Sequence, residues 1–217
     1  MTGSIAVTES FLIGKLKENP YFFEQLHQLA KKVEHSRRVA SIGREIAQKE
    51  GMDADAMAVA CLLHDVAYCV PGVPMENHTR HGRLSAVIAR PFITSLDMPA
   101  EIIEDILYGI AIHVDGEADF EGEKTVFART ISDAIIIERY GALGIFEELN
   151  DLQFFKLERD EKLYHVSRLL REAEEANLPE PATLTARELR LFQLSFYAEY
   201  FRRMKTQLFN SAAPFEP

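Results

Sequence analysis

Cysteine is scarce in this sequence: Cys61 and Cys69 are the only two among 217 residues. A disulfide framework needs more cysteines than this, so the pair fits a reducing compartment. The first residues, MTGSIAVTES, have no basic segment followed by an apolar core, which a secretory signal would need. No stretch approaches the roughly 18 consecutive apolar residues of a membrane span. We therefore expect a cytoplasmic protein with no membrane partner.

Positive charge is also in short supply. The chain has 24 lysines and arginines against 34 aspartates and glutamates, which gives a formal net charge of −10. Binding to a nucleic-acid polymer depends on neutralising many phosphates, so this balance argues against such a partner. A small anionic ligand needs only a local basic cluster and is compatible with the composition.

Stretches with the two-residue alternation of strands, joined by hairpin turns, are missing as well. Almost every patterned segment has helical period instead, which predicts an all-α fold. The segment 34–51 predicts a helix that ends at Gly51, and Asp53 is placed to cap the next helix. Pro91 should kink or end the helix that follows His81, and Pro99 lies where the start of another helix tolerates proline.

The last part of the chain predicts two further helical features. A helix over 125–140 should be closed by Gly141, and the tail should begin with a capping box formed by Thr185 and Glu188. Aromatic residues then recur at helical spacing along the tail: Phe192, Phe196, Tyr197, Tyr200 and Phe201. Such a stripe predicts packing against a core, and its exposed members could support a homodimer.

The residues that could carry chemistry lie mostly at the edges of these predicted helices. Five of the seven histidines fall between residues 35 and 113: His35, His64, His78, His81 and His113. His64 and Asp65 close an apolar run, and Asp133 lies in the apolar stretch ARTISDAIII. A carboxylate there is costly unless it is paired or binds a cation.

Taken singly, each of these groups has an ordinary structural explanation, such as a helix cap, a surface residue or an ion pair. Together they form the ordered series His…His-Asp…His…His…Asp on successive predicted helices. Neutral imidazoles and carboxylates are the ligands that divalent iron, manganese and zinc bind. Because a helical bundle can bring helix ends together, the series predicts a metal site.

The order and context of these residues resemble the HD-domain metal-dependent phosphohydrolase superfamily, in its small single-domain bacterial type. The segments that carry the resemblance are EHSRRV (34–39), LLHDVA (62–67), HGRLSA (81–86), GIAIH (109–113) and ISDAIIIERYGALGIF (131–146). The resemblance implies one HD-type helical bundle over 1–217. Its metal-binding core would span about 30–145, with additional C-terminal helices over about 150–210.

The resemblance also implies a ligand set for one or two divalent metal ions, with iron or manganese favoured over zinc, nickel or magnesium. The implied primary ligands are His35, His64, Asp65 and Asp133. His81 and His113 match positions that bind a second metal in dinuclear relatives, where Asp65 would bridge the two ions. His78 is the substitute for His81 if the helix starts elsewhere.

For activity, the resemblance implies that metal-activated water cleaves a phosphoester or pyrophosphate bond of a small phosphorylated substrate, with a nucleotide expected. The implied catalytic groups are Asp65, His113 and Tyr68. The expected substrate contacts are Arg38, Arg80 and Arg83. Tyr68 stands where many relatives have lysine or glutamate, which leaves the general acid open between Tyr68, His113, Asp115 and Glu76.

Two other functions fit the same sequence. Some six-ligand members of the superfamily are di-iron oxygenases, so oxidation of a small organic substrate is the main alternative. A non-catalytic nucleotide-binding or interaction module is the third. It ranks last because all four core ligands, His35, His64, Asp65 and Asp133, are present.

Overall fold

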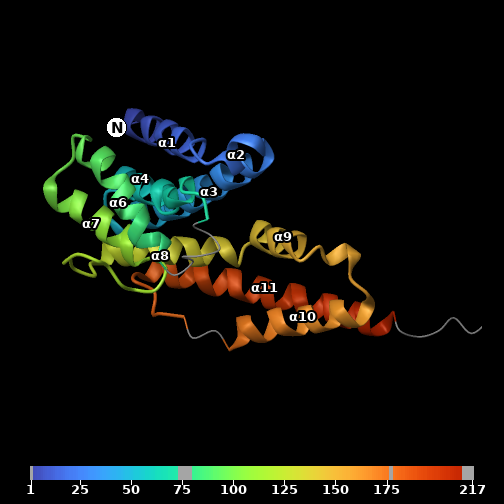
Figure 1. Cartoon of the computed structure of the whole chain (residues 1–217). Helices are drawn as coiled ribbons and strands as arrows, with labels where there is room; N and C mark the ends of the chain where they lie inside the picture. Colours follow the sequence, from blue (N-terminus) through green and yellow to red (C-terminus); the bar gives the residue numbers. More distant parts are fainter. Residues whose placement is uncertain (1, 73–79, 176–177, 212–217) are drawn as a thin grey trace, which may run out of the picture. The chain divides into compact units, whose positions relative to one another are not determined.

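Every regular element in the computed structural model, which describes residues 2–72, 80–175 and 178–211, is a helix (Figure 1). The expected all-α class is therefore confirmed. Within these ranges no helix combines the length and apolar character needed to cross a lipid bilayer.

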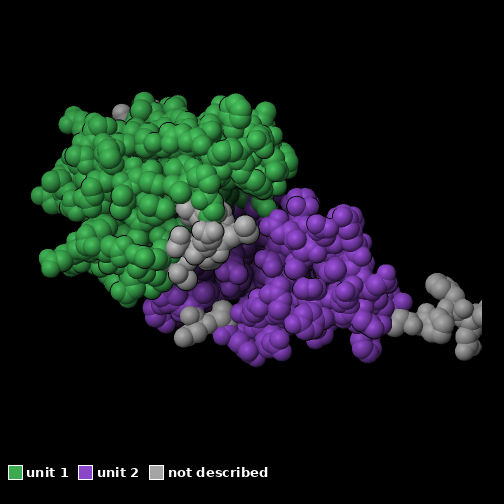
Figure 2. All heavy atoms as spheres, viewed as in Figure 1, with its two compact units in different colours: residues 1–135, 181–186 green, residues 136–180, 187–217 purple. Residues whose placement is uncertain are grey.

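The chain divides into two compact units (Figure 2). One unit comprises residues 1–135 and 181–186, and the other comprises residues 136–180 and 187–217. All the predicted site residues belong to the first unit. The expectation of one HD-type domain over the whole chain stays a prediction.

The first unit is built around α4, a helix that is buried along all but its first two residues. Its elements are α1 (Thr2–Leu16), α2 (Pro20–Glu24), α3 (Leu26–Glu50), α4 (Ala54–Leu63), the short 3-10 helix η1 (Val66–Cys69), α6 (His81–Thr94), α7 (Ala100–Ile112) and most of α8 (Val126–Arg139). Every residue of α4 from Ala56 to Leu63 is buried, and α1, α3 and α7 pack against it. The apolar run that precedes His64 thus forms the centre of the core.

Several predicted helix ends are confirmed. Gly51 ends α3 with φ at 74°, a left-handed conformation that glycine adopts without strain. The Asp53 side chain accepts hydrogen bonds from the backbone of Asp55 and Ala56, so it caps α4 as expected. Pro99 directly precedes α7. Together these ends fix the lengths of the helices that lead to the site.

Three expectations about helix ends differ from the structure. α6 continues past Pro91 to Thr94, so Pro91 does not end the helix, and the alternative of a kink there stays a prediction. Gly141 caps the start of α9 instead of closing α8. The tail helix begins at Leu184, where Thr183 caps the backbone of Ala186, so the predicted capping box is wrong.

The second unit has its own small core. Its elements are α9 (Ala142–Asp151), the short 3-10 helix η2 (Phe154–Lys156), α10 (Arg159–Glu174) and the main part of α11 (Leu184–Asn210). Tyr197 and Phe201 of the aromatic stripe are buried there, whereas Phe192 is 70% exposed and Phe196 is 41% exposed. The packing expectation therefore holds for one row of the stripe and is wrong for the other. The homodimer stays a prediction.

Candidate metal centre

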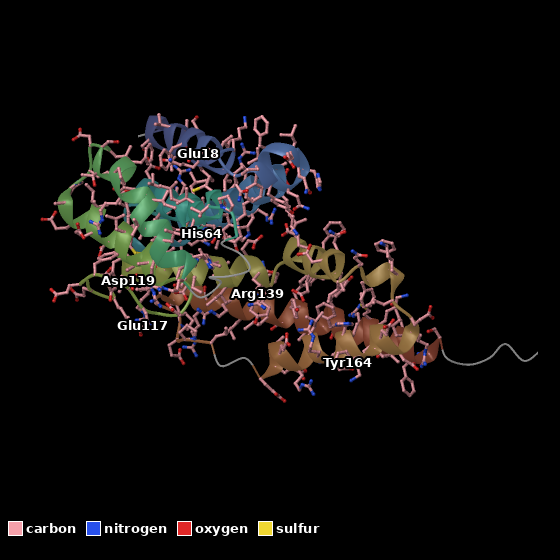
Figure 3. The ribbon with its side chains drawn as sticks, viewed as in Figure 1. Glu18, His64, Glu117, Asp119, Arg139 and Tyr164 are labelled. Carbon is pink, nitrogen blue, oxygen red and sulfur yellow. The ribbon has the colours of Figure 1, made fainter. Side chains whose placement is uncertain are left out.

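Predicted metal ligands converge at the C-terminal end of α4, in the interior of the first unit. His64, labelled in Figure 3, directly follows this helix. His35 comes from α3, His81 is the first residue of α6, and His113 directly follows α7. Two groups have all their ligand atoms within 4.8 Å of one another: His35, His64 and Asp65; and Asp65, His81 and His113. Asp65 is common to both clusters.

The carboxylate of Asp65 presents one oxygen to each histidine pair. Its Oδ2 atom lies 3.2 Å from His64 Nε2 and 3.8 Å from His35 Nε2. Its Oδ1 atom lies 3.1 Å from His81 Nε2 and 3.7 Å from His113 Nε2. One carboxylate thus offers a ligand atom to each of the two candidate metal clusters.

A glycine brings the second histidine pair together. A Cβ atom at Gly82 would lie 2.7 Å from the carbonyl oxygen of Ala111 and 3.0 Å from His113 Nδ1. Only a residue without a side chain lets α6 approach α7 this closely. The approach places the Nε2 atoms of His81 and His113 3.2 Å apart.

Backbone carbonyls fix the ring orientation of two of the histidines. His64 Nδ1 lies 2.7 Å from the carbonyl oxygen of Cys61, and His113 Nδ1 lies 2.7 Å from that of Ile110. Because a carbonyl oxygen can only accept, each Nδ1 carries the proton. In the neutral ring, Nε2 then has a lone pair that faces the cluster. This orientation is the usual one for a histidine that binds a metal through Nε2.

The protonation states also suit a cation. Burial lowers the pKa of both His64 and His113, which favours the neutral ring. Burial alone would raise the pKa of Asp65, but the positive charge of Lys32 helps to hold this pKa well below its usual range. The site therefore contains neutral imidazoles around an ionised carboxylate.

One oxygen of this carboxylate is left without a suitable donor. Asp65 Oδ1 is buried and accepts no well-aligned hydrogen bond from the described residues. A buried anion with an unsatisfied oxygen is costly unless a cation binds it. Each cluster offers two imidazole nitrogens and one carboxylate oxygen, which is a donor set suited to divalent iron, manganese or zinc. The residues present therefore fit the implied metal.

Asp133, the sixth predicted ligand, belongs to neither cluster. It lies on α8, is 3% exposed, and its Oδ2 atom accepts a hydrogen bond of 2.8 Å from the backbone of Ala182. The structure thus brings five of the six predicted ligands together and gives the sixth a partner far along the chain.

The predicted substrate-binding arginines are held by acidic residues after α7. Arg83 forms ion pairs with Asp115 and Asp119, and the hydrogen bond to Asp115 raises the pKa of Arg83. Arg80 is 62% exposed on its side chain and lies 3.5 Å from Asp119, which Figure 3 labels. The pairs place both arginines at the loop that follows His113.

The remaining candidate residues lie on α3, on η1 or outside the described chain. Arg38 is partly buried on α3, three residues after His35. Tyr68 is partly buried in η1, with its ring 5.6 Å from that of His81 between centroids. Glu76 and His78 lie outside the described residues.

Lys32 is a residue of the site that sequence reasoning missed. Its Nζ atom donates a hydrogen bond to Asp65 Oδ2 and lies 3.7 Å from the centroid of the Tyr68 ring. The one available signal was its position three residues before His35, which puts both side chains on the same face of a helix. Lysines at such positions are common on solvated helix faces, so the signal is weak.

Comparison with known proteins agrees with this geometry. Residues 33–138 match the family model of the HD domain. No significant match was found among curated proteins or among solved structures. The matched range contains both clusters and Asp133, and the HD-domain superfamily consists mostly of metal-dependent hydrolases. With its paired histidines around one buried His-Asp dipeptide, the chain belongs to the HD-domain superfamily.

Proposed function

We propose that this protein is a metal-dependent phosphohydrolase that cleaves a phosphoester or pyrophosphate bond of a small phosphorylated substrate, with a nucleotide as the expected class. The observation that carries the proposal is the Asp65 carboxylate, which presents one oxygen to each of two histidine pairs. Pairs of metal sites joined in this way suit the attack of a water on phosphorus.

Divalent cations bound there would lower the pKa of a coordinated water and neutralise charge on the phosphoryl oxygens. The protein's part is to hold the ligands in place. The Cys61 and Ile110 carbonyls orient His64 and His113. Asp65 stays ionised, because its pKa is held well below the usual range.

Tyr68 is the general acid that we favour among the described candidates, since its ring lies 5.6 Å from that of His81 between centroids. His113 belongs to one of the candidate metal clusters, so its Nε2 lone pair would be committed to a bound cation and could not also carry a proton to a leaving group. Burial raises the pKa of Tyr68, which keeps its hydroxyl protonated at neutral pH. A protonated phenol can donate a hydrogen bond to the departing oxygen.

Hydrolysis of a substrate panel tests the proposal. Protein purified anaerobically and loaded with manganese or iron would be assayed with nucleotides, dinucleoside polyphosphates and phosphomonoesters. We expect turnover of at least one class, seen as release of phosphate, pyrophosphate or a nucleotide product, and loss of this turnover in Asp65→Asn. Metal-loaded protein that hydrolyses none of them would contradict the proposal.

The same two clusters fit the main alternative, a di-iron oxygenase acting on a small organic substrate. The observation in its favour is the second histidine pair, His81 and His113, which completes a site for two iron ions. Oxygen consumption by the iron-loaded protein with an organic substrate, together with inertness towards phosphate esters, would establish it.

A further inference from the structure

Lys32 places an ammonium group inside the proposed metal centre. It lies on α3, and its side chain is 16% exposed. Its Nζ atom is bonded to Asp65 Oδ2, the same oxygen that faces His64 and His35. A role for this lysine has to be compatible with the positive charge of its ammonium group and with that of a metal ion bound to the same oxygen.

The ammonium and a divalent cation compete for this oxygen. Both are positive, and they would lie within a few ångströms of each other, where like charges repel strongly in a poorly hydrated site. A doubly charged ion, held also by His35 and His64, would win this competition. Nζ would then have to leave Asp65 Oδ2, so its ion pair there belongs to the metal-free protein.

The displaced ammonium would stay at the edge of the site. The backbone of Lys32 is fixed in the second turn of the long helix α3, which begins at Leu26. The face of the Tyr68 ring, 3.7 Å from Nζ, attracts a cation by roughly 0.5–2 kcal/mol. Tyr68 itself carries no charge, so Lys32 supplies a positive charge at this point. An anion bound to the metal ions would be a suitable partner for a lysine held beside them.

We propose that Lys32 is a substrate-binding residue with two successive partners. It neutralises Asp65 while the site contains no divalent cation, and it binds an anionic oxygen of the substrate's phosphate group once the cation is bound. The second step rests on the proposed phosphohydrolase function. A lysine contributes three donors and a full charge to such an oxygen, which makes it a common phosphate ligand.

Calorimetric titrations of manganese and of inorganic phosphate test both steps. The variants are Lys32→Gln and Lys32→Met, which remove the charge, and Lys32→Arg, which keeps it. Lys49→Gln is the matched control, since Lys49 is an exposed lysine of the same helix, paired with Glu45. Circular dichroism would confirm that each variant is folded.

We expect the two neutral variants to bind manganese at least as tightly as the wild type. Their manganese-loaded forms should bind phosphate at least about tenfold more weakly, as expected for one lost charged hydrogen bond. Lys32→Arg should restore phosphate affinity to within about threefold, and Lys49→Gln should match the wild type. Unchanged phosphate affinity in both neutral variants overturns the proposal. Loss of manganese binding in them also overturns it, because Lys32 would then only position Asp65.

Failure of this inference can be told apart from failure of the proposed function. If the loaded protein binds phosphate through Lys32 but hydrolyses no phosphorylated substrate, the hydrolase proposal fails and the role of Lys32 in anion binding stands. If it hydrolyses a substrate and the neutral variants keep both phosphate affinity and KM, only the role of Lys32 fails.

Discussion

His81 Nε2 lies 3.1 Å from Asp65 Oδ1. His64 faces the other oxygen of the same carboxylate, Asp65 Oδ2. The two halves of the centre therefore share a single residue, and each half has its own pair of histidines. Substitutions can consequently remove one half or both, which makes metal stoichiometry a direct probe of the geometry.

His81→Ala is expected to lower the bound metal from about two ions to about one per chain, because the second cluster loses a ligand while the first keeps all of its own. Asp65→Asn should reduce metal binding at both clusters, since the neutral amide replaces the carboxylate that they have in common. Metal content after anaerobic purification, measured by plasma mass spectrometry, checks both. His27→Ala, at an exposed histidine on α3, is the control. Two ions retained by His81→Ala would remove His81 from the site.

Gly82→Ala is expected to destabilise the protein by about 1–3 kcal/mol and to lower binding at the second cluster, because the added methyl would push α6 away from α7. Urea unfolding and metal content measure the two effects. The matched control is Gly14→Ala in α1, where a Cβ meets nothing within 4 Å. It should be neutral or stabilising by up to about 1 kcal/mol. If the two substitutions behave alike, the close approach at Gly82 has no energetic role.

The clustered ligands could be predicted from the sequence because each is conspicuous locally. His64 and Asp65 follow an apolar run, and His81 and His113 stand at the ends of periodic segments. Polar groups at such positions are costly to bury, and one cation bound by several of them would offset this cost. Their order along successive helices then gave the likeness to the HD-domain superfamily, which the family match over 33–138 supports.

Partners that depend on the path of the chain could not be predicted. Asp65 meets Lys32 from 33 positions earlier, and Asp133 meets Ala182 from 49 positions later. Helical period shows which face of a helix is buried but not which distant segment will cover it. The close approach at Gly82 is likewise a property of two packed helices, and a single glycine inside a helical pattern does not reveal it.

The metal-free protein is expected to lose stability as the pH falls below about 6.5, the ordinary pKa of histidine. Burial lowers the pKa of His64 in the folded state, so on acidification the unfolded state takes up this proton first. The contribution of His64 to the free energy of unfolding is complete above the pKa that His64 has in the unfolded state. It is lost as the pH falls towards the lower pKa that His64 has in the folded state. Urea unfolding with a chelator at pH 8 and pH 5.5 measures it. His64→Gln should flatten the dependence and His27→Gln should leave it unchanged; equal slopes in both would contradict the assignment.

The ion pair between Arg83 and Asp115 is expected to restrain a substrate-binding group. Arg83 can neutralise a phosphate only after releasing the Asp115 carboxylate, to which it donates a hydrogen bond. Asp115→Asn should therefore lower KM for a phosphorylated substrate. Arg83→Gln should raise KM about tenfold, with a smaller change in kcat.

Steady-state kinetics on the substrate found in the panel measures both effects. Arg44→Gln is the control, because Arg44 forms a comparable ion pair with Asp55 on exposed parts of α3 and α4, and it should leave KM unchanged. If Asp115→Asn raises KM as much as Arg83→Gln does, the pair acts as one structural unit that shapes the loop after His113. In that case Arg83 affects KM only by holding this loop in place, and direct binding of the substrate by its guanidinium is excluded.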